Sequence, residues 1–213
     1  MNLYQHLIIL FVIISGSSLS GQDITRKDLM GNQYTWNTHE LKKTNAQGEF
    51  LYSWQNLGGG EITWTDPGNQ FRILIFSKES NQIIWLDNKL SQIGNPLNLD
   101  LLGIHDLSGI CSSKNGGFWA FDKSTQMLLK FNQSLDKQIE IPVRIKIENS
   151  SETWVQMLEW KQQLFFLIPD EKALVADLFG QIIKRIPVKA NSMLIGKDGL
   201  LFISQNDSLL YWK

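Results

Sequence analysis

The sequence of 213 residues holds a single cysteine, Cys111, so the chain can form no internal disulfide. Its stability must therefore come from an apolar core large enough to hold the fold without covalent links. A lone cysteine in the apolar segment LSGICSS is typical of a small buried hydrophobe. No general base lies beside it in the sequence, as a catalytic thiol would need.

The chain also has no large excess of charge of either sign. The chain has 20 Lys and Arg against 21 Asp and Glu, which gives a formal net charge of −1 and an isoelectric point near 6.3. This balance excludes the basic surface that nucleic acids or anionic membranes attract, and we expect no nucleic-acid partner. With 43% hydrophobic and 19% charged residues, the composition is that of an ordinary globular protein.

Long hydrophobic runs are missing as well. The apolar segment LIILFVII at residues 7–14 is too short for a helix across a bilayer, which takes about 20 residues. Small residues follow it, and Ser18-Leu19-Ser20 fits the rule for signal-peptide cleavage. We predict a cleaved signal peptide over residues 1–21 and one domain over residues 22–213, exported to the periplasm or cell surface with no membrane span. The first residues lack Lys and Arg, so an uncleaved anchor or a buried first strand stays the alternative.

The usual catalytic motifs are also absent. There is no G-x-S-x-G elbow and no phosphate-binding loop, since the GGG at residues 58–60 lacks the Lys and Ser/Thr of such a loop. The predicted domain contains two histidines, His39 and His105, with no paired metal-ligand spacing. We therefore expect no catalytic residues, no metal site and no cofactor.

The chain does contain short apolar runs rich in β-branched and aromatic residues, separated by Gly, Asn, Asp and Pro. Examples are FRILIF, QIIWL, GFWAF, MLLKF, QLFFLI and LLFIS. No amphipathic helix longer than two turns interrupts them. This pattern predicts an all-β fold, either a sandwich, a barrel or a propeller.

An internal repeat favours the propeller. A polar break follows each third expected strand at Asn45, Asp87, Asn132 and Asp177, with spacings of 42, 45 and 45 residues. A period near 40–45 residues with four strands is typical of propeller blades. A second set of turns leads into each second strand, in DLMGNQY, DPGNQF, SKNGGFW, EWKQQLFF and GKDGLLF. We expect the bulky residue after each of these turns to begin a strand that packs between neighbouring blades.

We predict five blades of about 36–47 residues, with four as the alternative. The expected ranges are 23–55, 61–99, 107–143, 153–188 and 192–213. The fifth stops after its third strand, and a segment near residues 21–25 could supply the fourth. If HELKKTN forms no strand, EFLYSW at residues 49–54 would complete the last sheet and leave four blades.

A family resemblance points the same way. The run at residues 52–104, with ILIF, LDNKLSQIG and LLG within it, resembles exported, uncharacterised bacterial β-propeller-like proteins. The pieces GFWAFD and LFGQIIKRIPV continue the likeness over most of the domain. More distantly, the D-x-G-N-x-aromatic turns are similar to NHL-type and gluconolactonase-type propellers. The near resemblance implies the fold and export, and fold alone does not carry function.

The distant resemblance implies one enzymatic alternative, a metal-dependent lactonase or esterase that binds a hard cation around the channel. Its nominees would be Glu61, Asp66, Asn69, Asp87 and Asp177, although each also fits a turn.

The eight tryptophans suggest where a ligand would bind. Propellers need bulky residues between blades, so Trp85 and Trp119, in central strands, are expected to pack in the core. The candidate binding surface comprises Trp64, Trp154, Trp160, His105 and Asp106. The function we expect is a non-catalytic binding or scaffold propeller for a protein or envelope component. Carbohydrate binding through exposed tryptophans is a further alternative.

Overall fold

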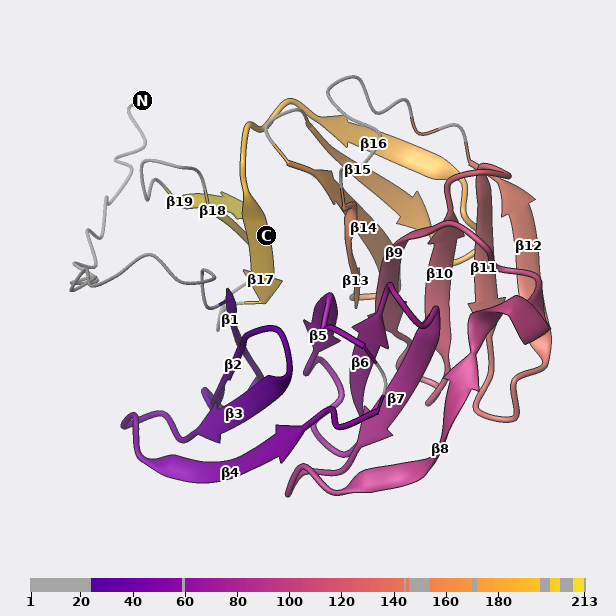
Figure 1. Cartoon of the computed structure of the whole chain (residues 1–213). Helices are drawn as coiled ribbons and strands as arrows, with labels where there is room; N and C mark the ends of the chain where they lie inside the picture. The colour runs from indigo at the N-terminus through magenta and orange to yellow at the C-terminus, as the bar shows by residue number, and fades with distance from the viewer. Residues whose placement is uncertain are drawn as a thin grey trace, which may run out of the picture.

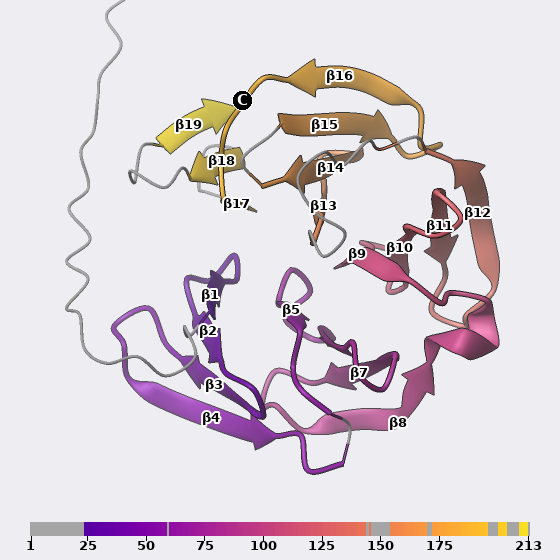
Figure 2. The same cartoon turned by 45° about the horizontal axis from the view of Figure 1, so that its top comes forward.

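The computed structural model describes residues 24–58, 60–143, 145, 154–169, 172–195, 200–203 and 209–212. The predicted signal peptide at residues 1–21 lies outside this part of the chain. In these residues nineteen strands form five antiparallel sheets, and Figures 1 and 2 show the sheets placed around a common centre. The all-β propeller is thus confirmed.

Four sheets have four strands and the fifth has three, each in sequence order from the centre outward. Blade 1 contains β1 (Ile24–Lys27), β2 (Gln33–Trp36), β3 (Glu40–Thr44) and β4 (Phe50–Gln55). Blade 2 contains β5 (Trp64–Asp66), β6 (Ile73–Ser77), β7 (Gln82–Leu86) and β8 (Gln92–Asn98). Blade 3 contains β9 (Leu107–Ser112), β10 (Phe118–Asp122), β11 (Met127–Phe131) and β12 (Lys137–Pro142). Blade 4 contains β13 (Gln156–Trp160), β14 (Gln163–Ile168), β15 (Lys172–Asp177) and β16 (Ile182–Ile186). The fifth sheet contains β17 (Ser192–Ile195), β18 (Leu200–Ile203) and β19 (Leu209–Trp212).

Blade 1 lies within the expected range of residues 23–55, and two alternatives for closing the ring are not found among the described residues. HELKKTN contains a strand, β3, and Phe50–Gln55 pairs with it instead of completing the last sheet. Residues 24 and 25 pair with β2 in blade 1 and add no strand to the fifth sheet. β3 has little apolar content, but its alternating Leu41 and Lys43 are both buried.

The four repeat markers share one structural role. Each lies at the turn between the third and fourth strands, and its side-chain oxygen accepts backbone N–H groups of that turn. Asp87 Oδ1 accepts from Lys89 N and Ser91 N at 2.8 Å each, and Asp177 Oδ1 accepts from Phe179 N and Gln181 N at 2.9 Å each. Asn45 and Asn132 make equivalent bonds. The repeat therefore records a turn, since Asn and Asp bond their own backbone a few residues on.

The core lies between the blades rather than at the centre alone. Separate buried clusters join blades 1 and 2, blades 2 and 3, blades 3 and 4, and blade 4 and the fifth sheet. Trp85 and Trp119 are buried in these clusters, as predicted. Phe71 is the exception among the bulky residues expected to begin packing strands. It lies in the β5–β6 turn and is 66% exposed, because β6 begins two residues later.

Within the described residues, no helix is long and apolar enough to cross a bilayer. The single helical element there is a short 3-10 turn, η1 (Leu99–Leu102), between β8 and β9.

Candidate functional site

The structure brings together two of the five predicted surface residues, Trp64 and Trp154. Trp64 begins the innermost strand of blade 2, Trp154 directly precedes that of blade 4, and their ring centroids are 5.4 Å apart. Trp154 also stacks on Phe76 at 5.5 Å, and Trp36 meets Trp64 edge-on at 6.4 Å. Trp64 is 5% exposed whereas Trp154 is half-buried, so a ligand from solvent would meet Trp154 first.

Trp160 lies apart from this pair. It ends β13, whereas Trp154 precedes that strand, and its ring is 6.2 Å from Phe165. The Lys161 ammonium lies 4.4 Å from the centre of the Trp160 ring. These contacts place Trp160 against the cluster between blade 4 and the fifth sheet.

His105 and Asp106 lie on the surface, in the segment that enters β9. His105 Nδ1 is 3.0 Å from Asp100 Oδ1, and this hydrogen bond is the main cause that lowers the pKa of Asp100. The His105 amide donates to Asp122 Oδ2, and the Asp106 carbonyl accepts from the Lys123 amide. These bonds tie the entry of β9 to the β10–β11 turn, so the pair has a structural role as well as an exposed imidazole.

Sequence reasoning missed Arg26, which reaches across the centre from β1. Its guanidinium carbon lies 3.9 Å from the centre of the Trp64 ring, and Nη2 donates to Gln156 Oε1 at 3.0 Å. Gln156 in turn donates to the Asn191 carbonyl at 2.6 Å and accepts from the Met193 amide at 3.2 Å. One arginine therefore connects blades 1, 2 and 4, and its glutamine partner extends the link to the fifth sheet.

Burial lowers the pKa of Arg26 to about 10, although the nearby Asp66 and Cys111 act in the opposite direction. The side chain retains some exposed surface, but protein atoms crowd its guanidinium. It remains a cation at neutral pH. We refer to Arg26, Trp64, Ser108, Trp154, Gln156 and Asn191 as the axial cluster. They lie in or just before the innermost strands β1, β5, β9, β13 and β17, which surround the centre of the ring in Figure 2.

A second polar group beside the axial cluster contains Asp66, Cys111 and Glu159. Asp66 Oδ2 accepts from the Ser112 amide at 2.6 Å, and Glu159 Oε2 accepts from Trp119 Nε1 at 2.6 Å. Burial raises the pKa of the Cys111 thiol well above its usual value, and Asp66 and Glu159 raise it further. The thiol is therefore protonated at neutral pH and unsuited to nucleophilic attack.

The carboxylates nominated for a cation do not converge in the described part of the chain. No group of three or more His, Cys, Asp or Glu residues gathers there as a metal site. Asp87 and Asp177 hold their own turns, and Asp66 bonds to backbone amides of Gly68 and Ser112. These bonds explain each of the three carboxylates without a metal.

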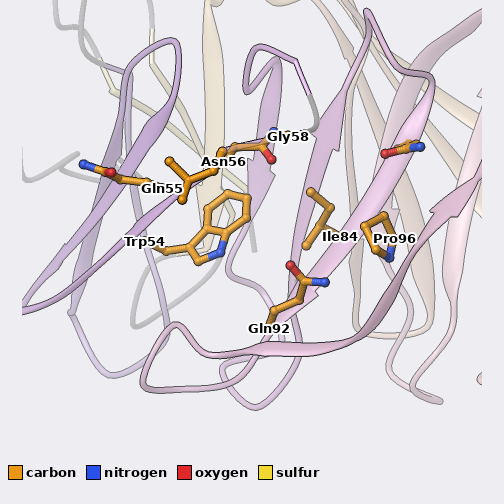
Figure 3. A pocket seen from close by; sticks show the side chains of 9 residues that line it. Trp54, Gln55, Asn56, Gly58, Ile84, Gln92 and Pro96 are labelled. Carbon is orange, nitrogen blue, oxygen red and sulfur yellow. The ribbon is translucent and has the colours of Figure 1, made fainter.

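The outer strand of blade 1 offers a different kind of site. Residues Phe50, Leu51 and Tyr52 of β4 and Leu57 after it are exposed large hydrophobics. Beside them lies an open groove of about 380 Å³ between β4 and the β7–β8 pair. In Figure 3 the Trp54 ring faces this groove from one side and Ile84, Gln92 and Pro96 from the other. We call β4 together with Leu57 and this groove the blade 1 edge.

The fourth strands of blades 2, 3 and 4 are protected against pairing with another chain. β12 carries Lys137, Glu140 and Pro142, and β16 carries Lys184 and Arg185. β8 contains Pro96 and a glycine with φ +69°. Charged residues, proline and glycine interrupt or repel an added strand, and β4 (FLYSWQ) has none of them. Among the described strands, β4 pairs only with β3, so its outer backbone groups face no strand.

Comparisons with solved structures agree with the fold. A Bacteroides caccae protein of unknown function aligns with TM-score 0.61 and 11% identity, over 90% of this chain and 75% of that one. A catalytically inactive virginiamycin B lyase from Staphylococcus aureus, solved with quinupristin, aligns with TM-score 0.59 and 9% identity, over 87% and 63%. The Pan2 WD40 domain of Neurospora crassa aligns with TM-score 0.58 and 8% identity, over 90% and 60%.

At these identities the likeness shows a shared propeller fold alone. The chain spans less than two thirds of the lyase and of the Pan2 domain. Neither the protein-family models nor the curated proteins gave a match to the sequence.

Proposed function

We propose that this protein is a non-catalytic binding propeller that captures an extended segment of a partner protein along the blade 1 edge. The single observation that carries the proposal is the contrast between β4 and the fourth strands of blades 2, 3 and 4. An extended peptide adds to an exposed sheet edge through main-chain hydrogen bonds, while pockets for alternate side chains give selectivity. The edge of β4 offers the first, and the groove lined by Trp54 and Ile84 offers the second.

The chemistry of the edge selects the partner segment. β4 has no charged side chain and presents Phe50, Leu51 and Tyr52, so an apolar or aromatic strand fits better than a charged one. A partner without peptide groups, such as a nucleic acid, could not form the strand-to-strand hydrogen bonds that the main chain of β4 offers. We propose that the encounter takes place after export, in the periplasm or at the cell surface.

Site-directed crosslinking tests the proposal. A photoreactive benzophenone side chain at Phe50 should crosslink a partner in envelope fractions, whereas the same group at Phe71 should not. Phe71 is the matched control, because it is 66% exposed and Phe50 is 63% exposed. With the purified partner, Phe50→Lys with Leu51→Lys should weaken binding roughly tenfold or more, because lysines on an edge strand oppose pairing. Phe71→Lys should leave the affinity unchanged.

Hydrogen exchange distinguishes strand addition from other contacts. The backbone amides of Phe50–Gln55 that point away from β3 should exchange more slowly in the complex, because the partner's carbonyls accept from them. Unchanged exchange in β4 would overturn the proposal. Crosslinks to a second copy of this chain would replace the partner with self-association. Hydrolysis of small lactones or esters that depends on a divalent cation would replace binding with the enzymatic alternative.

A further inference from the structure

The axial cluster is independent of the blade 1 edge and contains more hydrogen-bond donors than the protein uses. A guanidinium has five N–H groups. Among the described residues, Arg26 uses one of them for a hydrogen bond, to Gln156, and its guanidinium lies over the Trp64 ring. Arg26 forms no ion pair among the described residues. The nearby carboxylate, Asp66, accepts from the backbone amides of Gly68 and Ser112 instead. A cation with little hydrogen bonding and partial burial is costly unless something anionic or polar meets it.

Four further polar atoms of the cluster are buried without a hydrogen-bond partner. They are Trp64 Nε1, Ser108 Oγ, Trp154 Nε1 and Asn191 Oδ1. Trp64 and Ser108 are themselves more than nine-tenths buried. Buried polar atoms in folded proteins nearly always have a partner, so each unpaired atom calls for an occupant. Trp64 and Ser108 lie in the innermost strands of blades 2 and 3, and Trp154 and Asn191 lie just before those of blade 4 and the fifth sheet. The unpaired atoms therefore belong to residues around the centre of the ring.

The balance of donors and acceptors indicates the occupant. Two indole N–H groups, a hydroxyl and the remaining N–H groups of Arg26 outnumber the single unpaired amide oxygen. Such a donor-rich set fits an anion. The guanidinium fork matches the two oxygens of a carboxylate. The Asp66 carboxylate lies close enough to act on Arg26 and would repel a dianion, so a single negative charge fits better than phosphate.

We propose that the axial cluster is a binding site for a small monocarboxylate, whose two oxygens pair with the Arg26 guanidinium beside the Trp64–Trp154 pair. Arg26 and Trp154 both keep some exposed surface, which gives solvent access to the site. Gln156 orients the guanidinium through Oε1, and the bonds from the Arg26 and Met193 groups to that oxygen fix the amide.

Titrations of the full chain at constant ionic strength test this site. Acetate, glucuronate and inorganic phosphate are the probes, and the indole N–H resonances of Trp64 and Trp154 are the readout. We expect saturable shifts of both resonances with the two carboxylates and much weaker shifts with phosphate. Arg26→Lys should weaken binding about tenfold, because an ammonium cannot form the two-pronged pair, and Arg26→Gln should abolish it.

Arg72→Gln is the matched control. Arg72 also lies over a tryptophan, with its guanidinium carbon 4.4 Å from the centre of the Trp85 ring, but it bonds to the Gly116 carbonyl outside the axial cluster. Its loss should leave carboxylate affinity unchanged. If Arg26→Gln does not fold, Trp64→Phe retains a ring while removing one donor and should weaken binding.

Three results would overturn the proposal: no saturable shift with any carboxylate, equal affinity in Arg26→Gln, or a structure in saturating acetate with water alone in the cluster. The Phe50→Lys variant should bind carboxylate normally, so this test fails or succeeds independently of partner binding at the blade 1 edge.

Discussion

Strands β4 and β12 occupy the same position in their blades but present different edges. Both are outermost, both pair with the third strand alone among the described strands, and both follow a turn in which an Asn side chain accepts from the amide four residues on. β12 alternates charged and apolar residues and carries a 2.8 Å ion pair between Lys137 and Glu140. β4 is uncharged and exposes Phe50, Leu51 and Tyr52.

The difference shows that the blade framework does not require an apolar edge. Blade 3 is built on the same turn chemistry and has a charged outer strand, so the residues of β4 are not needed to form a fourth strand. An edge that promotes pairing carries a risk of aggregation that proteins usually avoid. Its retention in one blade out of four fits a binding role for the blade 1 edge.

The largest expected effect is on the free energy of unfolding, and it distinguishes a core residue from a residue of the blade 1 edge. Phe118 in β10 is fully buried and stacks on Phe131 at a centroid distance of 5.0 Å. Phe118→Ala should lower the free energy of unfolding by about 3–5 kcal/mol, because it removes apolar contacts and leaves a cavity. Phe50→Ala should change it by less than about 0.5 kcal/mol. Urea denaturation of both variants measures the difference, and similar losses would mean that Phe50 supports the fold rather than binding.

A smaller effect tests whether the two outer strands are held by the same turn. Asn45 Oδ1 accepts from the Gln47 and Glu49 amides, and Asn132 Oδ1 accepts from the Asp136 amide. Asn132→Ala should cost about 1 kcal/mol, the usual net value of one such bond, and Asn45→Ala should cost more because it removes two. Thermal unfolding of both variants checks this order. A cost confined to Asn132 would show that β4 is anchored differently from β12.

The smallest expected effect is a change in stability with pH. It distinguishes blade 3 from blade 1 at the turn between their second and third strands. Burial raises the pKa of Asp122, but hydrogen bonds from Ser124 and from backbone amides, including those of His105 and Thr125, outweigh it and lower the pKa. Because the pKa of Asp122 is lower in the folded state, the carboxylate stabilises the fold at pH values above its unfolded pKa of about 4. This stabilisation is lost as the pH falls through the folded-state pKa.

Blade 1 has the neutral Asn37 at the corresponding turn, where its side chain accepts from the His39 and Glu40 amides. Asp122→Asn should therefore be less stable than the native chain at neutral pH, with the gap narrowing in acid. Asn37→Ala should cost the same at both pH values. Denaturation series at several pH values measure the gap, and a constant gap for Asp122→Asn would contradict the assignment.

The blades were predictable because their signals are local. The Asn and Asp markers bond to amides two to four residues away, so the turn that they form is written within a single hairpin. The expected blade ranges consequently agree with the observed strands to within a few residues at most ends. Trp85 was placed correctly for a similar reason, since a central strand of a blade is covered on both faces.

The sites were less predictable because they depend on position in the assembled ring. FLYSWQ is as apolar as a core strand, and only its place at the outer edge leaves it exposed. Arg26 meets Gln156 across 130 residues of sequence, a contact that no local pattern encodes. A charged residue within the first strand was the available signal, and it has meaning only once all inner strands share one centre.

The aromatic cluster at that centre also provides a spectroscopic probe of how the ring assembles. Trp36, Trp64 and Trp154 belong to or adjoin blades 1, 2 and 4, and their indoles come within coupling distance at 6.4 and 5.4 Å. Hairpins form from neighbouring residues, whereas these rings meet after distant parts of the chain have converged. Exciton coupling in circular dichroism would therefore time the closure of the ring separately from the appearance of its strands.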